Sequence, residues 1–420
     1  MYLGVIADDF TGGTDIAGFM VQEGMRVVQY IGVPASATSP ADGVVISLKS
    51  RSCPAPEAVR DSLSALDWLR SKGCERFYFK YCSTFDSTWR GNIGPVTDAL
   101  LDALDQDITV IAPALPVNGR TVYAGYLFVN GVPLDESGMR DHPLTPMRDA
   151  NLMRLIEAQA SGKAGNVPYP VLERGAEAVA GALAALHKKG ARYAIADALH
   201  AGHLDTLAQA VGNMPLVTGG SGLGGAMARQ WTAGRSANAG RTGGTDLGAP
   251  PGGRCVVLSG SASRMANVQI ARYKKLAASA TLNVERCLRE REAYALELAA
   301  WAAPLSSSRY APMLYATAGP EELKSVQSAF GAEAAGRAIE DLFARLAIEL
   351  KQAGVDHFIV AGGETSGAVV KALGINAFHI GPQIAPGVPW VRAVDQPVSL
   401  ALKSGNFGDE DFFAKAQENW

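Results

Sequence analysis

The chain has 420 residues, a formal net charge of −3 and 48% hydrophobic residues. Its Lys and Arg residues are dispersed, so composition excludes the basic patch that nucleic acid or an anionic membrane requires. No apolar run approaches the roughly 18 residues of a membrane span, and the N-terminus lacks a signal-like segment. We therefore expect a cytoplasmic protein of two or three domains with a small-molecule partner, and self-association stays open.

In the first 231 residues, apolar runs alternate with helical patterns. This rhythm is typical of a mostly parallel sheet covered by helices. Strands are expected at 2–7, 26–31, 43–48, 76–80, 108–112, 192–196 and 214–218, and helices at 14–24, 55–72, 94–105, 174–189 and 201–211. Residues 118–150, which are rich in Gly, Pro and Asn, are interpreted as a flap or insertion that lines a site.

Hydrophobic periodicity stops at residues 232–253, which are dense in Gly, Ala, Ser, Thr and Pro, and we interpret them as a linker. A second α/β series follows over 254–420, so the sequence predicts two domains, each with a mostly parallel, helix-covered sheet, and an active site in the cleft between them. Its expected strands are 255–259, 281–285, 312–317, 357–361 and 376–380, and its helices are 262–279, 288–303 and 331–353.

Two adjacent carboxylates, Asp8 and Asp9, directly follow the first strand. Ligands of open α/β sheets bind beyond the carboxyl ends of strands, where these groups can hold a hydroxyl, a proton or a metal. The alternative is that Asp8 is a loop residue and that Asp15 is a charge favoured in the first turn of a helix.

The densest polar cluster, residues 80–92, follows the strand at 76–80. It combines cations, hydroxyls, a carboxylate and an amide, which suits a small polyhydroxy anion. The candidate ligands are Lys80, Ser83, Thr84, Asp86, Arg90 and Asn92, with Arg51 and Arg120 as contributors from two other strand ends. The alternative is that the Ser and Thr residues only cap the next helix.

Residues 217–225 contain the spacing G-x-G-x-x-G from Gly220 to Gly225. A dinucleotide-binding fingerprint continues into a helix, a strand and an acidic residue, whereas here we expect the linker to follow. We therefore exclude dinucleotide binding and keep a phosphate-facing or interdomain loop as the alternative.

Three small-residue loops in the second domain follow strand-like runs. Such loops favour nucleotide phosphates, because backbone N–H groups and helix N-termini converge on one point. Their candidate residues are Ser259, Gly260, Ser261, Gly362, Gly363, Glu364, Thr365, Ser366 and Gly405. His200 and His203 are interpreted as surface or core residues, since no carboxylate at helical spacing completes a metal site, and the metal ligands stay unassigned. The five cysteines form no C-x-x-C pair and predict neither a disulfide framework nor a zinc site.

Six motifs in this order resemble the four-carbon acid sugar kinase family over nearly the whole chain. They lie at residues 6–12, 79–88, 90–94, 113–120, 361–366 and 402–408. The resemblance implies a substrate-binding domain followed by a nucleotide-binding domain, and transfer of the γ-phosphoryl group of ATP, with Mg²⁺, to the terminal (C4) hydroxyl of the sugar.

The resemblance favours a 3-oxo-tetronate as the acceptor. Two alternatives stay open: a reduced tetronate such as threonate or erythronate, and a non-catalytic acid-sugar sensor. The implied roles are substrate binding for Asp8, Arg51, Lys80, Ser83, Thr84 and Arg90, nucleotide binding for the three loops of the second domain, and general base for Asp9 or Asp86.

Overall fold

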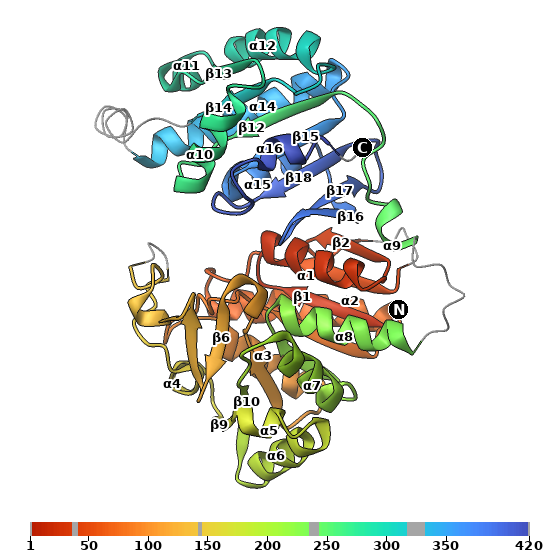
Figure 1. Cartoon of the computed structure of the whole chain (residues 1–420), viewed down its shortest axis with the longest axis vertical. Coiled ribbons are helices and arrows are strands. Elements are labelled where there is room, and N and C mark those ends of the chain that lie inside the picture. Colours follow the sequence, from red (N-terminus) through yellow and green to blue (C-terminus); the bar gives the residue numbers. More distant parts are fainter. Residues whose placement is uncertain (1, 36–40, 142–144, 235–242, 317–331, 419–420) are drawn as a thin grey trace. The chain divides into compact units, whose positions relative to one another are not determined.

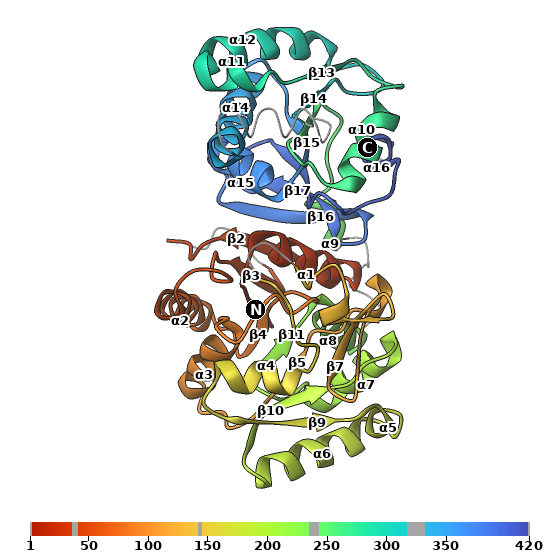
Figure 2. The same cartoon turned by 90° about the vertical axis from the view of Figure 1, so that its left-hand side faces the viewer.

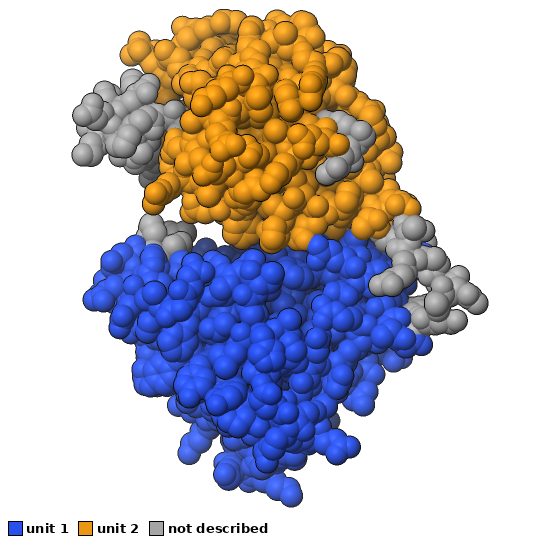
Figure 3. Space-filling model, in the orientation of Figure 1, with its two compact units in different colours: residues 1–244 blue, residues 245–420 orange. Residues whose placement is uncertain are grey.

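The computed structural model describes residues 2–35, 41–141, 145–234, 243–316 and 332–418. The chain divides into two compact units, Met1–Gly244 and Thr245–Trp420 (Figure 3). No helix in the described ranges combines the length and the hydropathy needed to cross a bilayer. All five cysteines are free thiols.

Unit 1 contains a parallel sheet in the order β2-β3-β1-β4-β11-β5-β10-β9. Its central strands are continuous apolar runs because helices cover both faces. The strands are β1 (Leu3–Ala7), β2 (Val27–Ile31), β3 (Gly43–Ser47), β4 (Arg76–Lys80), β5 (Thr109–Ala112), β9 (Lys163–Val167), β10 (Ala191–Ala196) and β11 (Leu216–Gly219). Strands β6 (Arg120–Tyr123), β7 (Tyr126–Val129) and β8 (Val132–Pro133) form a small antiparallel sheet within the predicted insertion, of which residues 142–144 lie outside the described residues.

The helices of unit 1 form two layers. In Figure 2, α2 and α3 lie on one side of the sheet, and α7 and α8 lie on the other. The helices are α1 (Phe10–Gln22), α2 (Ala55–Ser71), α3 (Ile93–Ala103), α4 (Leu152–Gln159), α5 (Tyr169–Leu172), α6 (Ala176–Lys188), α7 (Ala201–Val211) and α8 (Ser221–Ala233), with 3₁₀ turns η1 (Pro116–Asn118) and η2 (Leu134–Glu136). The short helix α9 (Gly243–Asp246) spans the division between the units.

Unit 2 has the strand order β13-β14-β12-β15-β18-β17-β16, parallel as far as β18 and antiparallel for the last two strands (Figure 1). Its core contains Val257, Ile359, Trp390 and Phe412. The strands are β12 (Cys255–Ser259), β13 (Ser279–Thr281), β14 (Met313–Tyr315), β15 (His357–Ala361), β16 (Ala377–Ala385), β17 (Val388–Ala393) and β18 (Ser399–Lys403). The helices are α10 (Arg264–Tyr273), α11 (Val284–Arg289), α12 (Arg291–Ala302), α14 (Ala332–Gln352), α15 (Gly363–Ala372) and α16 (Phe412–Lys415), with the 3₁₀ turn η3 (Ala303–Leu305).

The two units share a topology that the sequence did not reveal as a repeat. The order β2-β3-β1-β4 in unit 1 corresponds to β13-β14-β12-β15 in unit 2. In each unit the second and third strands lie on one side of the first strand, and the fourth strand pairs with the first on its other side. Such a reversal of strand order is a topological switch point, where ligands of open α/β sheets bind. The switch points are the carboxyl ends of β1 and β4, and of β12 and β15.

The mostly parallel α/β fold is confirmed, and three local predictions are wrong. The strand predicted at 281–285 lies earlier in the chain, because β13 ends at Thr281 and the Asn283 side chain accepts a hydrogen bond from Arg286 N at the start of α11. Residues 221–225 are not a loop, because α8 begins at Ser221. The helix predicted over 262–279 is shorter, as α10 ends at Tyr273.

The predicted linker at 232–253 contains secondary structure on both sides of residues 235–242. Helix α8 continues to Ala233, and α9 occupies Gly243–Asp246. Residues 235–242 lie outside the described residues, as does residue 317 of the predicted strand 312–317. The domain limits of 231 and 254 stay a prediction.

Candidate active site

The carboxyl ends of β1, β3 and β4 bring together the acidic and basic residues singled out in the first domain. Lys80 is the last residue of β4 and pairs with Ala7, after which Asp8 and Asp9 follow β1. Backbone bonds from Ser50 N and Arg51 N to the carbonyl of Asp8 hold the loop after β3 against them. The register of the parallel strands therefore places these side chains at the switch point of unit 1.

The guanidinium of Arg51 lies among three carboxylates. Its Nε and Nη2 donate to the two oxygens of Asp8 at 2.9 Å, which is a bidentate pair. Its Nη2 also lies 2.8 Å from Asp9, and its Nη1 lies 3.5 Å from Asp86. Because all three nitrogens of its fork already face protein carboxylates, Arg51 holds the site together more than it offers a free anion site.

The pKa values of the two adjacent aspartates are shifted in opposite directions. Burial raises the pKa of Asp8 against the opposing effect of Arg51. Burial also acts to raise the pKa of Asp9, but Arg51, Lys80 and hydrogen bonds from Thr11 and Gly12 outweigh it, so the pKa of Asp9 is lowered. Asp9 is also the N-cap of α1, since Gly12 N donates to its Oδ1 at 2.8 Å. Asp9 therefore has a structural role at the start of α1, and its role in catalysis stays a prediction.

The segment from Thr84 to Asp86 has an unusual backbone. Phe85 and Asp86 both have left-handed conformations, with φ of 64° and 48°. Such residues cost on the order of 1 kcal/mol or more each and persist where the surroundings fix them. Here the buried Phe85 ring packs 5.8 Å from that of Tyr81, and Thr84 Oγ1 donates to Asp86 Oδ1 at 2.7 Å. The turn aims the carboxylate of Asp86 toward Arg51.

Among the described residues, Lys80 and Arg120 form no ion pair with a carboxylate. The ammonium of Lys80 is buried and donates to the carbonyl of Tyr81 at 2.9 Å. Arg120 donates to the carbonyl of Asn118, and its Nε is buried with no hydrogen-bond partner in the described part of the chain. These two residues fit an anionic substrate group better than Arg51 does.

The remaining predicted ligands lie in different surroundings. Arg90 is exposed, and its guanidinium stacks 4.1 Å over the ring of Trp89. Asn92 is buried, and its amide donates to the carbonyls of Ser50 at 2.7 Å and Cys53 at 2.8 Å, so it supports the loop that carries Arg51. Ser83 is half-buried in the turn after β4.

A small cavity lies behind the guanidinium of Arg51. It has about 10 Å³ of space and is lined in part by Asp8, Asp86 and Asn92. This volume is no larger than one water molecule, so the cavity is not the substrate site.

The three predicted loops of unit 2 lie at the ends of adjacent strands. Gly260 N donates to the carbonyl of Ala361 at 3.0 Å, and Gly362 N donates to that of Lys403 at 2.9 Å. Helix α15 has no side-chain cap, so the first N–H groups after Gly362 are available to an anion. The loops after β12, β15 and β18 thus lie together at the second switch point.

Glycine and small hydroxyls keep this position open. A Cβ on Gly260 would overlap Thr365 Oγ1, and a Cβ on Gly405 would lie 2.6 Å from Ser263 Oγ. Gly362 has φ of 120°, a conformation that L-residues rarely adopt. The buried hydroxyls of Ser259 and Ser366 have no hydrogen-bond partner among the described residues. Backbone N–H groups and unpaired hydroxyls in one place form a cradle for phosphate oxygens.

Lys403 lies next to these loops, since its carbonyl accepts the hydrogen bond from Gly362 N. The sequence did not mark this residue as a candidate ligand. It is fully buried at the end of β18, where its ammonium donates to the carbonyl of Gly405 at 2.9 Å. Burial lowers the pKa of Lys403 to about 8. A buried cation with a single carbonyl acceptor is costly unless an anion compensates it.

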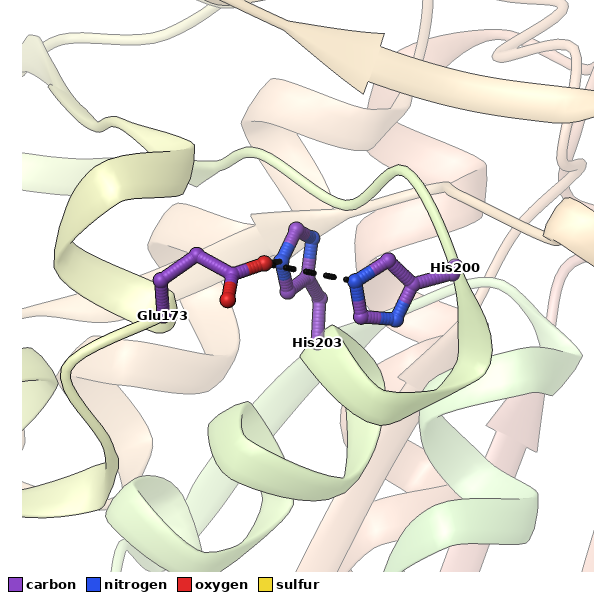
Figure 4. Close-up of side chains that lie close together, drawn as sticks. All are labelled: Glu173, His200 and His203. Atoms are coloured by element: carbon purple, nitrogen blue, oxygen red, sulfur yellow. Dashed lines mark hydrogen bonds and ion pairs between the residues drawn. The ribbon is translucent and has the colours of Figure 1, made fainter.

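A second polar cluster in unit 1 consists of Glu173, His200 and His203 (Figure 4). The carboxylate after α5 lies 2.6 Å from His203 Nε2 and 3.4 Å from His200 Nε2, so a distant segment supplies the group that helical spacing lacked. However, Leu199 N donates to His203 Nδ1 at 3.1 Å, which places the ring proton on Nε2. Metal-bound histidines show the reverse pattern, with Nδ1–H as the donor. The geometry of His203 therefore fits a hydrogen bond from its Nε2 to Glu173 and does not fit a metal ligand.

Two domain families match the chain, one within each of its two units. A sugar-binding N-terminal domain matches residues 3–227, and a nucleotide-binding C-terminal domain matches residues 256–413. The protein is thus of the class that joins a sugar-binding domain to a nucleotide-binding domain.

Full-length relatives define the family. A Brucella melitensis 3-oxo-tetronate kinase is 57% identical over 100% of this chain and 95% of its own length, and one from Pectobacterium atrosepticum is 56% identical over 100% and 99%. A crystal structure from Salmonella typhimurium LT2 has 55% identity and a TM-score of 0.94, and covers 100% of this chain and 99% of the other. A Haemophilus influenzae structure of the DUF1537 family has 54% identity and a TM-score of 0.86, with 99% of both chains covered. This chain belongs to the 3-oxo-tetronate kinase family, which confirms the resemblance found in the sequence.

Proposed function

We propose that this protein is a cytoplasmic kinase that transfers the γ-phosphoryl group of ATP to the C4 hydroxyl of a 3-oxo-tetronate. The observation that carries the proposal is its identity of 49–57% to relatives named 3-oxo-tetronate kinase, over 91% or more of this chain. Both switch points carry groups suited to that reaction.

The acid sugar binds at the switch point of unit 1. Lys80 and Arg120 bind its carboxylate, because their cations are less committed to protein carboxylates than Arg51 is. Arg51 orients Asp8, Asp9 and Asp86, and Asn92 fixes the loop of Arg51. Ser83, Thr84 and Arg90 are proposed as further ligands at the rim.

ATP binds at the switch point of unit 2. The residues fit its phosphates because glycine leaves the cradle unfilled, α15 presents uncapped N–H groups, and two buried hydroxyls lack partners. Mg²⁺ accompanies the nucleotide and neutralises charge that develops on the phosphates. Glu364, exposed in the first turn of α15, supplies a carboxylate oxygen of the kind Mg²⁺ prefers.

Asp9 and Asp86 act on the acceptor hydroxyl. The lowered pKa of Asp9 keeps it ionised, which suits orientation of a hydroxyl and binding of a cation. Asp9→Asn retains a good N-cap while removing the charge, so a large fall in kcat with an unchanged melting temperature supports the role. A lower melting temperature with proportionate loss of ligand binding would indicate a purely structural residue.

The substrate is tested by a coupled ADP-release assay over a panel of four-carbon acids. We expect the highest kcat/KM with a 3-oxo-tetronate. A higher value with threonate or erythronate would favour a reduced acid as the substrate, and binding without ADP release from any acid would favour a sensor. Omission of Mg²⁺ should abolish turnover.

A further inference from the structure

The glycine-rich start of α8 serves close packing against α1. A Cβ on Gly224 would lie 2.5 Å from Ile16 Cδ1, and one on Gly225 would lie 3.2 Å from Phe19 Cβ. Glycine at these two positions lets the helices approach closely without displacing Ile16 or Phe19. The motif from Gly220 to Gly225 therefore has a role other than phosphate binding.

This close packing brings Ser221 to Asp15. The hydroxyl of Ser221, which is fully buried at the first position of α8, donates to Oδ2 of Asp15. The other oxygen, Oδ1, is buried and has no hydrogen-bond partner in the part of the chain that the structure describes. Buried carboxylate oxygens are nearly always paired, because an unpaired one costs on the order of 1–3 kcal/mol. Asp15 thus retains an acceptor for a ligand.

Asp15 belongs to the charge cluster of the candidate active site. The charges that influence it are those of Lys80, Asp9 and Arg120. The first turn of α1 lies beside Lys80, since a Cβ on Gly12 would lie 3.0 Å from its Nζ. The two cations proposed to bind the acid sugar are thus close enough to Asp15 to influence its carboxylate.

The other carboxylates of the cluster are already engaged. Asp8 uses both oxygens on Arg51, and Asp9 accepts bonds from Thr11, Gly12 and Arg51. Asp86 accepts from Thr84 and faces Arg51. The oxygens of these three carboxylates thus already have hydrogen-bond or ion-pair partners within the protein. Of these four carboxylates, Asp15 alone has an oxygen that is both buried and unpaired.

We propose that Asp15 is the general base of the phosphoryl transfer and that Ser221 is the residue that positions it. The inference rests on the proposed function. The acceptor hydroxyl gives its proton to Oδ1 of Asp15, and its oxygen forms a bond to the γ-phosphorus. The bond from that phosphorus to the β–γ bridging oxygen breaks, and ADP leaves with the electron pair.

The pKa shift of Asp15 predicts the direction in which the pH profile of kcat should change. Burial raises the pKa of Asp15, whereas the hydrogen bond from Ser221 lowers it. A base must be deprotonated to act, so kcat should fall as the pH decreases through this pKa. Removal of the Ser221 hydroxyl should raise the pKa and move the acidic limb of the profile to higher pH.

Asp15→Asn is the first variant to measure in the full-length protein. We expect kcat to fall about 10²–10⁴-fold, the contribution of a general base, while the Kd of a non-hydrolysable ATP analogue is unchanged. A folded variant that keeps more than about a tenth of the wild-type kcat would overturn the proposal. If the wild-type protein releases no ADP with any tetronate, the proposed function fails first, and the two failures are thus distinct.

Ser221→Ala provides the second readout, with Ser62→Ala as its matched control. Ser62 is a fully buried serine on α2 whose hydroxyl has no hydrogen-bond partner among the described residues. We expect Ser221→Ala to shift the acidic limb of kcat to higher pH and Ser62→Ala to leave the profile unchanged. An unshifted limb in Ser221→Ala overturns the proposal, and it decides the matter alone if Asp15→Asn does not fold.

Discussion

Arg51 Nε and Asp8 Oδ2 lie 2.9 Å apart, and a second bond of equal length joins Nη2 to Oδ1. This bidentate pair sets the geometry of the loop after β3, because the same guanidinium also faces Asp9 and Asp86. Replacement by lysine keeps the charge but loses the planar fork.

Arg51→Lys should therefore lower both stability and activity. We expect the free energy of unfolding to fall by about 1–3 kcal/mol, the value of one or two charged hydrogen bonds, and kcat/KM for the acid sugar to fall at least tenfold. Denaturant titration and steady-state kinetics measure the two effects, with ATP affinity as the internal reference. Wild-type kcat/KM in this variant would show that the clamp is dispensable.

Asn92→Asp tests the support of that loop. The amide nitrogen donates to the carbonyls of Ser50 and Cys53, and a carboxylate would place an oxygen against both. Loss of two buried bonds should reduce the free energy of unfolding by about 2 kcal/mol or more and lower kcat. Thermal melts and ADP release test this outcome. A variant with normal stability but a raised KM would instead identify Asn92 as a direct substrate ligand.

Gly363→Val tests the phosphate cradle. The position is exposed and a Cβ there has no neighbour within 4 Å, so the fold should accept the side chain while phosphates should not. We expect binding of a non-hydrolysable ATP analogue to weaken by about one to several kcal/mol, measured by calorimetry. Gly367→Val is the matched control, because Gly367 lies on the same helix with the same open space. Equal affinities in the two variants would contradict the assignment.

Lys403 predicts a pH dependence of stability. The pKa of Lys403 is about 8 in the folded protein, whereas the ordinary pKa of a lysine is 10.5. Between these two pH values the unfolded chain therefore keeps a proton that the folded chain has released. Stability should then rise with pH over this window, by up to about 3 kcal/mol. Lys403→Met removes the ionisable group, so the variant should be more stable than the wild type at pH 7. This difference in the free energy of unfolding should shrink as the pH rises to 10.5. A constant difference across the window would show that Lys403 titrates normally.

The sequence predicted the parts of the site that lie next to one another along the chain. Asp8, Asp9 and Lys80 were found because apolar runs end directly before them, and Asp86 because it lies in the polar cluster that follows the strand at 76–80. The partners of Arg51 could not be predicted, since burial and register decide them. The contact of Ser221 with Asp15 joins residues 206 positions apart and depends on helix packing that the glycine pattern alone does not reveal. The same reason applies to Glu173, which follows α5, and His203, which lies in α7.

The central claim is best tested through the product of the purified protein. The protein is incubated with ATP, Mg²⁺ and a 3-oxo-tetronate, and the product is analysed by phosphorus–proton correlation NMR. We predict one new phosphate monoester whose phosphorus couples to the C4 methylene protons, formed in step with ADP. Phosphorus coupled to the C2 proton, or ATP consumption without a new ester, would contradict the claim.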